Sequence, residues 1–329
     1  MDNPKNKRKI LVTQALPYAN APLHLGHILE AVQTDIWVRF QNLNNNECHF
    51  FCADDTHGTP VMLKANEMAI SPEELIENVY VDHKSTYKLY DINFANFYST
   101  HSEENKKFSE LIYNSAKSNN LISKATIEQY FDEKEKMFLS DRFIKGTCPK
   151  CGAEDQNGDN CNECGASYEI QDLKNPKSIL SGTTPIKRES EHIFFDLPQK
   201  TEMLKNFLKT VQLQESIKNK LNEWLGDDLK KWDISRDAPY FGFEIPNEKD
   251  KFFYVWVDAP IGYIASIANW ASKNSLEMDD LWSENSDYEI HHFIGKDIAY
   301  FHGLFWPALL DSANFRLPDS INVHGFLTI

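Results

Sequence analysis

Strand-length apolar runs alternate with helical stretches at both ends of this 329-residue chain, and the alternation stops in between. The first run, Ile10–Gln14, ends in a turn signal and is followed by a helix-like stretch. Cys48–Ala53 begins the same order again. This succession of strand, loop and helix predicts a parallel sheet with helices on its faces. The expected fold class is therefore α/β.

Local signals place several helices in the first part of the chain. A helix is expected to begin near Leu25 and to bury one apolar face. Thr59 and Pro60 suit an N-cap and a first helical position, while Ser71–Glu74 and Thr100–Glu103 read as capping boxes. The apolar residues expected to form the buried face of the first helix are Leu25, Leu29, Val32, Ile36 and Phe40.

The alternation stops after about Asn120 and resumes near Asp233. The intervening stretch contains polar strands, four cysteines and two polar helices between Gln199 and Leu229. We expect one α/β domain split by an insertion, with residues 1–120 as its first half, 121–235 as the connective insertion and 236–329 as its second half. The second half is predicted to contain strand Phe252–Val257, a helix from about Gly262, strand Glu289–Ile294, helix Ile298–Leu310 and strand Asn322–Ile329.

Four cysteines form two Cys-x-x-Cys hooks, Cys148/Cys151 and Cys161/Cys164, and a glycine follows each hook. Each hook turns two thiolates toward one point, and four thiolates close a tetrahedral zinc site without an open position. Such a site, at about residues 145–170, is structural and indicates no chemistry by itself. A redox pair or two disulfides are the alternatives. The remaining cysteines, Cys48 and Cys52, lie in an apolar run and are expected to be reduced and buried.

The formal net charge of −15 excludes a protein that binds nucleic acid through a globally basic surface, although a local basic track stays possible. No secretory leader is recognisable at the start of the chain. The apolar stretch Phe252–Ala271 is interrupted by polar residues, so a buried strand and helix fit it better than a membrane span. We expect a cytoplasmic protein with no membrane or DNA partner.

Two histidines, His24 and His27, follow the first predicted strand and share a face of the first helical turn. Free backbone N–H groups and the helix dipole favour an anion there, and imidazole donors suit the α-phosphate of a nucleotide. Gly26 between them has no side chain, which lets a base or ribose lie against the helix. Helix-capping or core histidines are the alternative interpretation.

Together with four later stretches, the segment Ile10–His27 resembles the class I aminoacyl-tRNA synthetases, with His24-Leu25-Gly26-His27 as their HIGH motif. More narrowly, it resembles the methionyl-tRNA synthetases of the bacterial, zinc-containing type. The match is in register through nearly the whole chain and implies a Rossmann-like sheet domain split by a zinc-knuckle-containing insertion. The later stretches are Phe51–Pro60, Asp233–Asp237, Tyr254–Tyr263 and Phe293–Ile298.

The resemblance implies a two-step reaction that uses methionine, Mg·ATP and methionine tRNA as substrates. The methionine carboxylate attacks the α-phosphate of ATP, giving methionyl-adenylate and pyrophosphate, and the 3′-terminal adenosine of the tRNA then attacks the adenylate carbonyl. His24 and His27 would stabilise the phosphate in the transition state. Catalysis would come from positioning and electrostatics, with zinc as a structural ion.

The resemblance also assigns binding residues. Asp55 would pair with the substrate ammonium group, whereas Asp54 suits a turn or helix cap. On the ATP side it implies Gly26, Gly295, Asp297, Lys296 and Arg236, of which Lys296 and Arg236 are as consistent with a solvated lysine and a surface ion pair. Residues expected to line the methionine pocket, each equally consistent with core packing, are Ala15, Leu16, Tyr18, Trp256, Ala259, Pro260, Tyr263, Ile298 and His302.

The chain departs from the resemblance at its end. The family's mobile KMSKS loop and helical anticodon-binding domain do not occur after the last predicted strand. The chain is therefore expected to be the N-terminal part of a longer synthetase. We expect it to bind zinc and methionine but to activate methionine poorly and to charge tRNA negligibly.

Three other functions remain open from the sequence. A small-molecule nucleotidyltransferase also carries His-x-Gly-His, but would not be expected to contain a long zinc-bearing insertion. Another class I synthetase, for a branched amino acid or cysteine, would be expected to carry a larger editing insertion or an open zinc site. A non-catalytic zinc-ribbon module that binds RNA explains the cysteines but leaves the other matches as accidents.

Overall fold

A computed structural model describes residues 7–140, 143–158, 160–166, 168, 170–226 and 229–327. The chain divides into two compact units, each described by itself below. These divisions differ from the ranges expected from the sequence, because the two polar helices of the insertion cluster with the first unit. The first unit comprises Met1–Ser123, Phe194–Ile234 and Tyr240–Ile329, and the second comprises Lys124–Ile193 and Ser235–Pro239.

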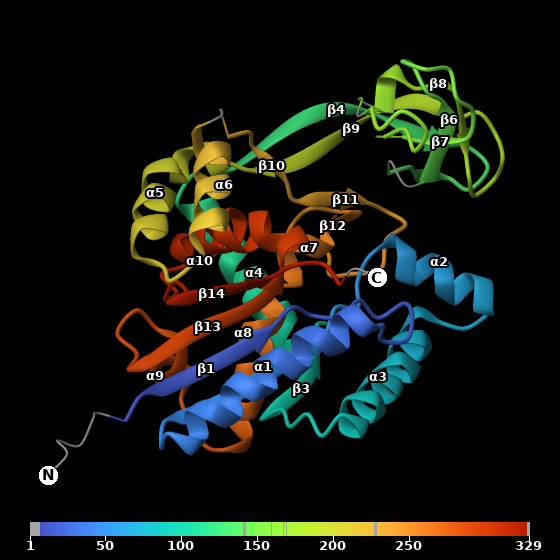
Figure 1. Ribbon diagram of the computed structural model, residues 1–329. Helices are drawn as coiled ribbons and strands as arrows, with labels where there is room; N and C mark the ends of the chain where they lie inside the picture. Colours follow the sequence, from blue (N-terminus) through green and yellow to red (C-terminus); the bar gives the residue numbers. More distant parts are fainter. Residues whose placement is uncertain are drawn as a thin grey trace, which may run out of the picture. The chain divides into compact units, whose positions relative to one another are not determined.

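Five strands form the sheet of the first unit, namely β1 (Lys9–Gln14), β2 (Glu47–Asp54), β3 (Asn96–Ser99), β13 (Tyr288–Gly295) and β14 (Ser320–His324). Their order across the sheet is β14–β13–β1–β2–β3 (Figure 1). Every neighbouring pair is parallel, which confirms the predicted parallel sheet. Sequence order reverses between β1 and β13, as in doubly wound folds.

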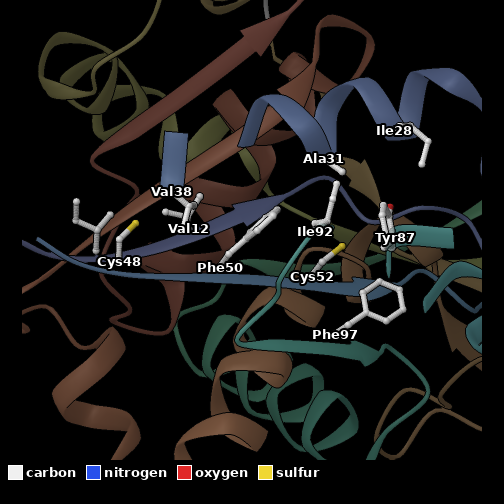
Figure 2. Packing of buried hydrophobic residues seen from close by; sticks show 11 residues of the cluster. Val12, Ile28, Ala31, Val38, Cys48, Phe50, Cys52, Tyr87, Ile92 and Phe97 are labelled. Carbon is white, nitrogen blue, oxygen red and sulfur yellow. The ribbon is translucent and has the colours of Figure 1, made fainter. Parts of the chain in front are cut away.

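Helices cover both faces of this sheet. Alternate residues of a strand point to opposite faces, so Phe50 and Phe51 of β2 face opposite ways. Phe50 lies in the core cluster shared with helix α1 (Leu25–Leu43) and with Tyr87 of α3 (Pro72–Leu89) (Figure 2). The Phe51 ring packs edge-on against Trp270 of α8 (Ile261–Lys273), with centroids 5.4 Å apart.

The predicted buried face of α1 is wrong. Leu25, Ile36 and Phe40 are 68%, 62% and 60% exposed, and Leu29 and Val32 are half-buried. Small or internally bonded residues face the sheet instead, because they allow close approach and leave no polar atom unsatisfied. Thr34, for example, donates its hydroxyl to the Glu30 carbonyl oxygen at 2.8 Å. The buried residues of the helix are Ile28, Glu30, Ala31, Thr34, Asp35, Val38 and Gln41.

Two predicted helix starts shift by one or two residues. Helix α2 (Thr59–Met68) has Gly58 as its N-cap, with a φ of +112° that favours glycine. Helix α4 (Glu103–Ser118) is capped by Ser102 rather than Thr100. The Thr100 hydroxyl contacts the Thr56 hydroxyl at 2.7 Å instead, so a tertiary contact replaces the expected cap. The predicted cap of α3 is confirmed, since Ser71 Oγ accepts from the Glu74 N–H.

The second half of the first unit departs from the prediction in three places. The expected strand Phe252–Val257 is a short strand β12 (Lys251–Phe253) followed by a helical turn α7 (Val255–Asp258). The expected helix Ile298–Leu310 is broken into a 3-10 turn η4 (Lys296–Ile298), a π-helix η5 (Phe301–Phe305) and α10 (Trp306–Ser312). Strand β14 ends at His324, and residues 328 and 329 of the predicted strand lie outside the described residues.

The predicted polar helices are α5 (Thr201–Thr210) and α6 (Glu215–Gly226), preceded by the turn η3 (Leu197–Lys200). Each contacts the second half of the sheet domain. Helix α5 packs against α10, and a methyl group added at Gly303 would lie 2.5 Å from Leu221 Cδ1 of α6. Gln212, between the two helices, forms a β-bridge with Ser320. These contacts explain why both helices cluster with the first unit. The remaining elements of this unit are β10 (Trp232–Asp233) and α9 (Met278–Trp282).

The second unit contains strands of two small sheets. In one sheet, β4 (Ile122–Asp132) lies between β5 (Met137–Phe138) and β9 (Ile186–Phe195). In another, β6 (Ile144–Thr147) lies between β7 (Gln156–Asn157) and β8 (Lys174–Ser178), with a turn η2 (Ile170–Asp172) before β8. The segment β11 (Ser235–Asp237) belongs to this unit, since Asp237 accepts from Ser190 Oγ at 2.9 Å and contacts His192 Nε2 at 3.0 Å.

Across the part of the chain that the structure describes, none of the helices is both long and apolar enough to cross a membrane.

Candidate active site

The candidate site residues follow strands that meet at one edge of the sheet. Ala15, Leu16 and Tyr18 follow β1, Asp55 follows β2, and Gly295–Ile298 follows β13. Ligands of doubly wound sheets bind beyond the carboxyl ends of the strands, where strand order reverses. The reversal between β1 and β13 therefore lies where the sequence placed the site.

His24 and His27 form the N-terminal cap of α1. His24 Nδ1 accepts from the Gly26 N–H at 3.1 Å, and His27 Nδ1 accepts from the His24 N–H at 3.3 Å. Their rings stack with centroids 3.7 Å apart. The capping and phosphate-binding interpretations are therefore compatible, because capping uses only Nδ1 of each ring.

The cap determines which nitrogen of each ring faces a ligand. An imidazole whose Nδ1 accepts a hydrogen bond carries its proton on Nε2. Burial, with smaller effects of His24 and His83, lowers the pKa of His27 to about 4, so its ring is neutral at pH 7. Two Nε2–H donors at a helix N-terminus suit a phosphate oxygen, and the neutral His27 ring donates without adding a charge.

Gly26 is required by the cap itself. A methyl group at this position would lie 2.9 Å from His24 Cε1 and 3.0 Å from His24 Nδ1. Any side chain would therefore displace the His24 ring from its hydrogen bond. This adds a structural reason for glycine to the open helix surface expected from the sequence.

Asp55 lies in a segment tied firmly to the loop after β1. Its N–H donates to the Pro17 carbonyl oxygen at 2.9 Å, and its own carbonyl oxygen accepts from the Ala19 N–H at 2.7 Å. The Tyr18 hydroxyl donates to the His57 carbonyl oxygen at 2.6 Å. The backbone of the Asp55 segment is thus fixed before any ligand binds.

The Asp55 side chain is left with unused hydrogen-bonding capacity. Its Oδ1 is buried and has no hydrogen-bond partner among the described residues. Burial, and next the charge of Asp258, raises the pKa of Asp55 well above its usual range. A buried carboxylate oxygen without a donor is costly, and an ammonium group would satisfy it.

Tyr263 and His302, which were both predicted to line the methionine pocket, form a hydrogen-bonded pair. His302 Nδ1 contacts the Ile298 carbonyl oxygen at 3.2 Å, so this nitrogen carries the proton. His302 Nε2 then accepts from the Tyr263 hydroxyl at 2.8 Å. Burial lowers the pKa of His302 to about 4, which keeps the ring neutral. The pair is therefore uncharged and buried, as a wall for an apolar side chain would have to be.

The other predicted pocket residues lie on α7, just before α8 and in the loop after β1. Trp256 of α7 stacks on Phe301, with ring centroids 4.4 Å apart and an angle of 14° between the rings. Ala259 and Pro260 lead into α8, with Pro260 at its N-cap. The Ala15 N–H donates to the Phe293 carbonyl oxygen at 3.0 Å. A methyl group added at Gly262 would lie 2.8 Å from Leu16 Cδ1, so α8 approaches the loop after β1 closely.

The predicted ATP-side residues other than Gly26 lie in two places: Gly295, Lys296 and Asp297 at the end of β13 and just after it, and Arg236 in the second unit. A methyl group at Gly295 would lie 2.5 Å from Asp297 Oδ1, so a side chain here would displace the exposed Asp297 carboxylate. Asp297 and Lys296 are exposed, and the Lys296 ammonium lies 4.2 Å from the centroid of the Phe326 ring. Arg236 belongs to the second unit, where it donates to the Ser235 carbonyl oxygen at 2.6 Å.

Sequence reasoning missed a buried network beside Asp55. His57 Nδ1 contacts Asp258 Oδ2, and His57 Nε2 contacts His101 Nδ1 at 3.0 Å. His57 and Asp258 lie inside stretches already quoted for the resemblance, but nothing in the sequence shows that they meet. His83 was also missed; it contacts Asp54 Oδ1 at 2.7 Å and the Ala21 carbonyl oxygen at 2.9 Å. Asp54 thus has a buried partner and does not act as an exposed turn residue.

The four predicted metal ligands meet in the second unit. The sulfur atoms of Cys148, Cys151, Cys161 and Cys164 all lie within 4.8 Å of one another. Two of the separations are 3.9 Å, between Cys148 and Cys164, and 3.6 Å, between Cys151 and Cys161. Tetrahedral zinc with bonds of about 2.3 Å requires sulfur atoms about 3.8 Å apart, so the donor set fits a zinc knuckle.

Each hook of this cluster has the same local form. Its second cysteine donates its N–H to the first cysteine's sulfur, at 3.4 Å in both hooks. Gly152 and Gly165, which follow the hooks, have φ values of +79° and +68°. The glycines predicted from the sequence are therefore needed for the backbone turn.

Comparison with known proteins identifies the class to which this fold and site belong. The family described as tRNA synthetases class I (M) matches residues 10–329. The chain therefore belongs to the class I tRNA synthetases.

Solved structures show a more particular likeness. A crystal structure of Mycobacterium tuberculosis methionyl-tRNA synthetase bound by methionyl-adenylate is 24% identical, with a TM-score of 0.74. The match covers 97% of this chain and 58% of that one. A second structure of the M. tuberculosis enzyme in complex with methionyl-adenylate is 23% identical, with a TM-score of 0.73 and coverage of 97% and 57%. The chain thus shares their fold and spans somewhat more than half their length.

Proposed function

We propose that this chain is the catalytic part of a methionine–tRNA ligase. It binds methionine and Mg·ATP, forms methionyl-adenylate and pyrophosphate, and passes the methionyl group to the 3′ end of methionine tRNA. The observation that carries the proposal is the Asp55 carboxylate, whose buried Oδ1 has no partner among the described residues, in a backbone already tied to the loop after β1.

The methionine site supports this substrate by its chemistry. Asp55 supplies a negative charge for the ammonium group, and Trp256, Tyr263 and His302 supply aromatic or neutral surface for a thioether. Sulfur–aromatic contacts contribute about 0.3–1.5 kcal/mol each. The same pocket residues as in the sequence analysis, Ala15, Leu16, Tyr18, Ala259, Pro260 and Ile298, complete the proposed site.

The ATP site combines the helix cap with the turn after β13. His24 and His27 are the proposed catalytic residues, since their Nε2–H groups are free of the cap and suit the charge that develops on the α-phosphate. Gly26 and Gly295 allow the backbone to approach the nucleotide, and Asp297 accepts from a ribose hydroxyl. Lys296 and Arg236 are proposed phosphate contacts on the strength of the resemblance.

The cysteine cluster is proposed to hold one structural zinc ion, through Cys148, Cys151, Cys161 and Cys164. A site closed by four thiolates has no position for substrate, so zinc serves the folding of the second unit. Magnesium would enter with ATP as its counter-ion. The cytoplasm, where tRNA is charged, is the proposed location, and neither a membrane nor DNA is proposed as a partner.

A binding screen tests the proposal. Isothermal titration calorimetry of the chain with each of the twenty amino acids, with and without Mg·ATP, should show binding of methionine alone. Preference for leucine, isoleucine, valine or cysteine would indicate another class I synthetase. Silence for every amino acid would contradict the proposal, and binding of RNA in the same screen would favour a zinc-ribbon module.

A further inference from the structure

A chain of hydrogen bonds runs from the exposed His101 through His57 to Asp258, and the last two residues are buried. Asp258 Oδ2 contacts His57 Nδ1, and the two side chains are 1% and 0% exposed. An ionised carboxylate only accepts, so His57 Nδ1 is the donor. His57 Nε2 contacts His101 Nδ1, 3.0 Å away, and burial, followed by the charge of His57, lowers the pKa of His101.

This network joins two segments that are far apart in the sequence. His57 lies two residues after Asp55, in the segment held by Pro17, Ala19 and the Tyr18 hydroxyl. Asp258 lies between Trp256 and Pro260, in the turn that carries three of the predicted pocket residues. The hydrogen bond between His57 and Asp258 therefore links two parts of the proposed methionine site. One is the segment of Asp55, which would bind the ammonium group, and the other is the Trp256–Pro260 turn, which would contact the methionine side chain.

Further contacts hold both ends of the network. The Gly58 N–H donates to the Phe241 carbonyl oxygen at 2.8 Å, and the His57 ring packs edge-on against Phe243 with centroids 4.6 Å apart. Asn105 Nδ2 donates to the Asp258 carbonyl oxygen at 3.2 Å. The remaining Asp258 oxygen, Oδ1, is buried without a partner among the described residues, as is Asp55 Oδ1. His57 thus supplies a donor to the Asp258 carboxylate, which has spare capacity to accept another.

We propose that His57 and Asp258 are positioning residues for recognition of the substrate amino group. Their hydrogen bond sets the separation between Asp55 and the Trp256–Pro260 turn. Asp55 can then bind the ammonium group of an amino acid while the turn contacts the side chain of the same molecule. Neither residue touches the reacting phosphate. This inference rests on the proposed function and adds residues to which the resemblance gave no role.

Two substitutions of His57 separate positioning from packing. Asparagine places an amide where Nδ1 lies and can still donate to Asp258. Glutamine reaches the place of Nε2 and keeps only the contact with His101. Both remove the ring from Phe243, so both are expected to lower the melting temperature similarly. Methionine affinity should fall about ten- to a hundredfold in His57→Gln and by no more than about threefold in His57→Asn, measured by calorimetry.

Two substitutions of Asp258 repeat the comparison at the other residue of the hydrogen bond. Asp258→Asn keeps an oxygen acceptor for His57 Nδ1, whereas Asp258→Leu has a similar volume and no acceptor. The leucine variant should lose more methionine affinity than the asparagine variant, and affinity for ATP should change little in either. This pair decides the matter if a His57 variant does not fold.

The outcomes distinguish the two proposals. If the unchanged chain binds methionine and the paired variants bind it with equal affinity, the positioning role is wrong and the proposed function stands. Equal losses within each pair that follow the loss of melting temperature would show a merely structural role and would also overturn the inference. If the unchanged chain binds no methionine, both proposals fail.

Discussion

The cysteine cluster of the second unit and the candidate active site of the first unit are assembled in opposite ways. All four cysteines lie between Cys148 and Cys164, and each hook makes its own turn. The candidate active-site residues come from segments as distant in the sequence as Ala15 and His302, which the parallel sheet brings into one unit. The cysteine cluster, which lies within one short segment, would depend on a bound metal. The candidate active site, which is assembled from distant segments, depends on the fold.

Stabilisation differs accordingly between these two regions. The knuckle has four thiolates and little apolar core, so a bound ion would supply most of its folding free energy. The sheet domain holds its site with buried hydrogen bonds, such as those of Asp55, Tyr263 and His302, before any ligand binds. Substitutions in each region test this difference.

Cys148→Ser should abolish zinc binding and unfold the second unit around β6 and β8. Structural zinc sites contribute on the order of 10 kcal/mol, and one missing thiolate opens the tetrahedral site. Hydrogen exchange should show lost protection in β6 and β8, with β1 and β2 still protected, and mass spectrometry should show loss of the metal. Cys48→Ser is the control, because Cys48 is buried in the first unit and should leave the zinc content unchanged. Full protection of β6 without metal would contradict the comparison.

His24→Asn should slow methionine activation about a hundredfold with little change in stability. Asparagine is a good N-cap, so the helix start is kept while the Nε2–H donor is lost. The measurement is methionine-dependent pyrophosphate exchange relative to the unchanged chain, together with a thermal melt. A large loss of stability with an unchanged exchange rate would show that the histidine only caps the helix.

Asp55→Asn should weaken methionine binding about fiftyfold while stabilising the fold. Loss of a charge-assisted hydrogen bond costs about 2–3 kcal/mol in affinity, which calorimetry would detect. Because burial raises the pKa of Asp55, the folded state holds its proton at pH values where the unfolded chain has released it. The free energy of unfolding therefore falls as the pH rises from the pKa of Asp55 in the unfolded chain through its pKa in the folded protein.

The pH dependence gives this prediction a second test. At neutral pH the asparagine variant should melt at a higher temperature than the unchanged chain, and the difference should vanish in acid. Methionine affinity of the unchanged chain should fall as the pH drops through the raised pKa of Asp55. A variant that melts lower at neutral pH would show that the Asp55 carboxylate is already satisfied without ligand.

Gly26→Ala should destabilise the first unit by about 1 kcal/mol, the usual value of an N-cap. Its methyl group would lie within 3.0 Å of the His24 ring and displace the cap. Gly226→Ala is the matched control, because a methyl group there meets open space at the end of α6. Urea denaturation of both variants measures the difference. Equal stability of the two would mean that the His24 ring moves aside without cost.

Local devices were predictable from the sequence because they depend on a few neighbouring residues. The zinc hooks, the Ser71 cap and the order of strands and helices need only spacing and residue type. The buried face of α1 was predicted wrongly because apolar spacing does not show that Thr34 can satisfy its hydroxyl within the helix. The break of the helix after Ile298 into a π-helix was also missed, because the apolar spacing of this stretch is that of a continuous helix.

The sequence by itself determined the parallel α/β sheet, the cysteine cluster and the stretches that form the candidate site. How those stretches interact became clear only in the folded chain, where Asp55 has a buried oxygen without a partner among the described residues, burial keeps His302 neutral beside Tyr263, and His57 contacts Asp258. Spacing along the chain fixes contacts within a helix or a turn. Contacts between distant segments depend on packing and on which buried polar atoms find partners, and these are set only when the whole fold is formed.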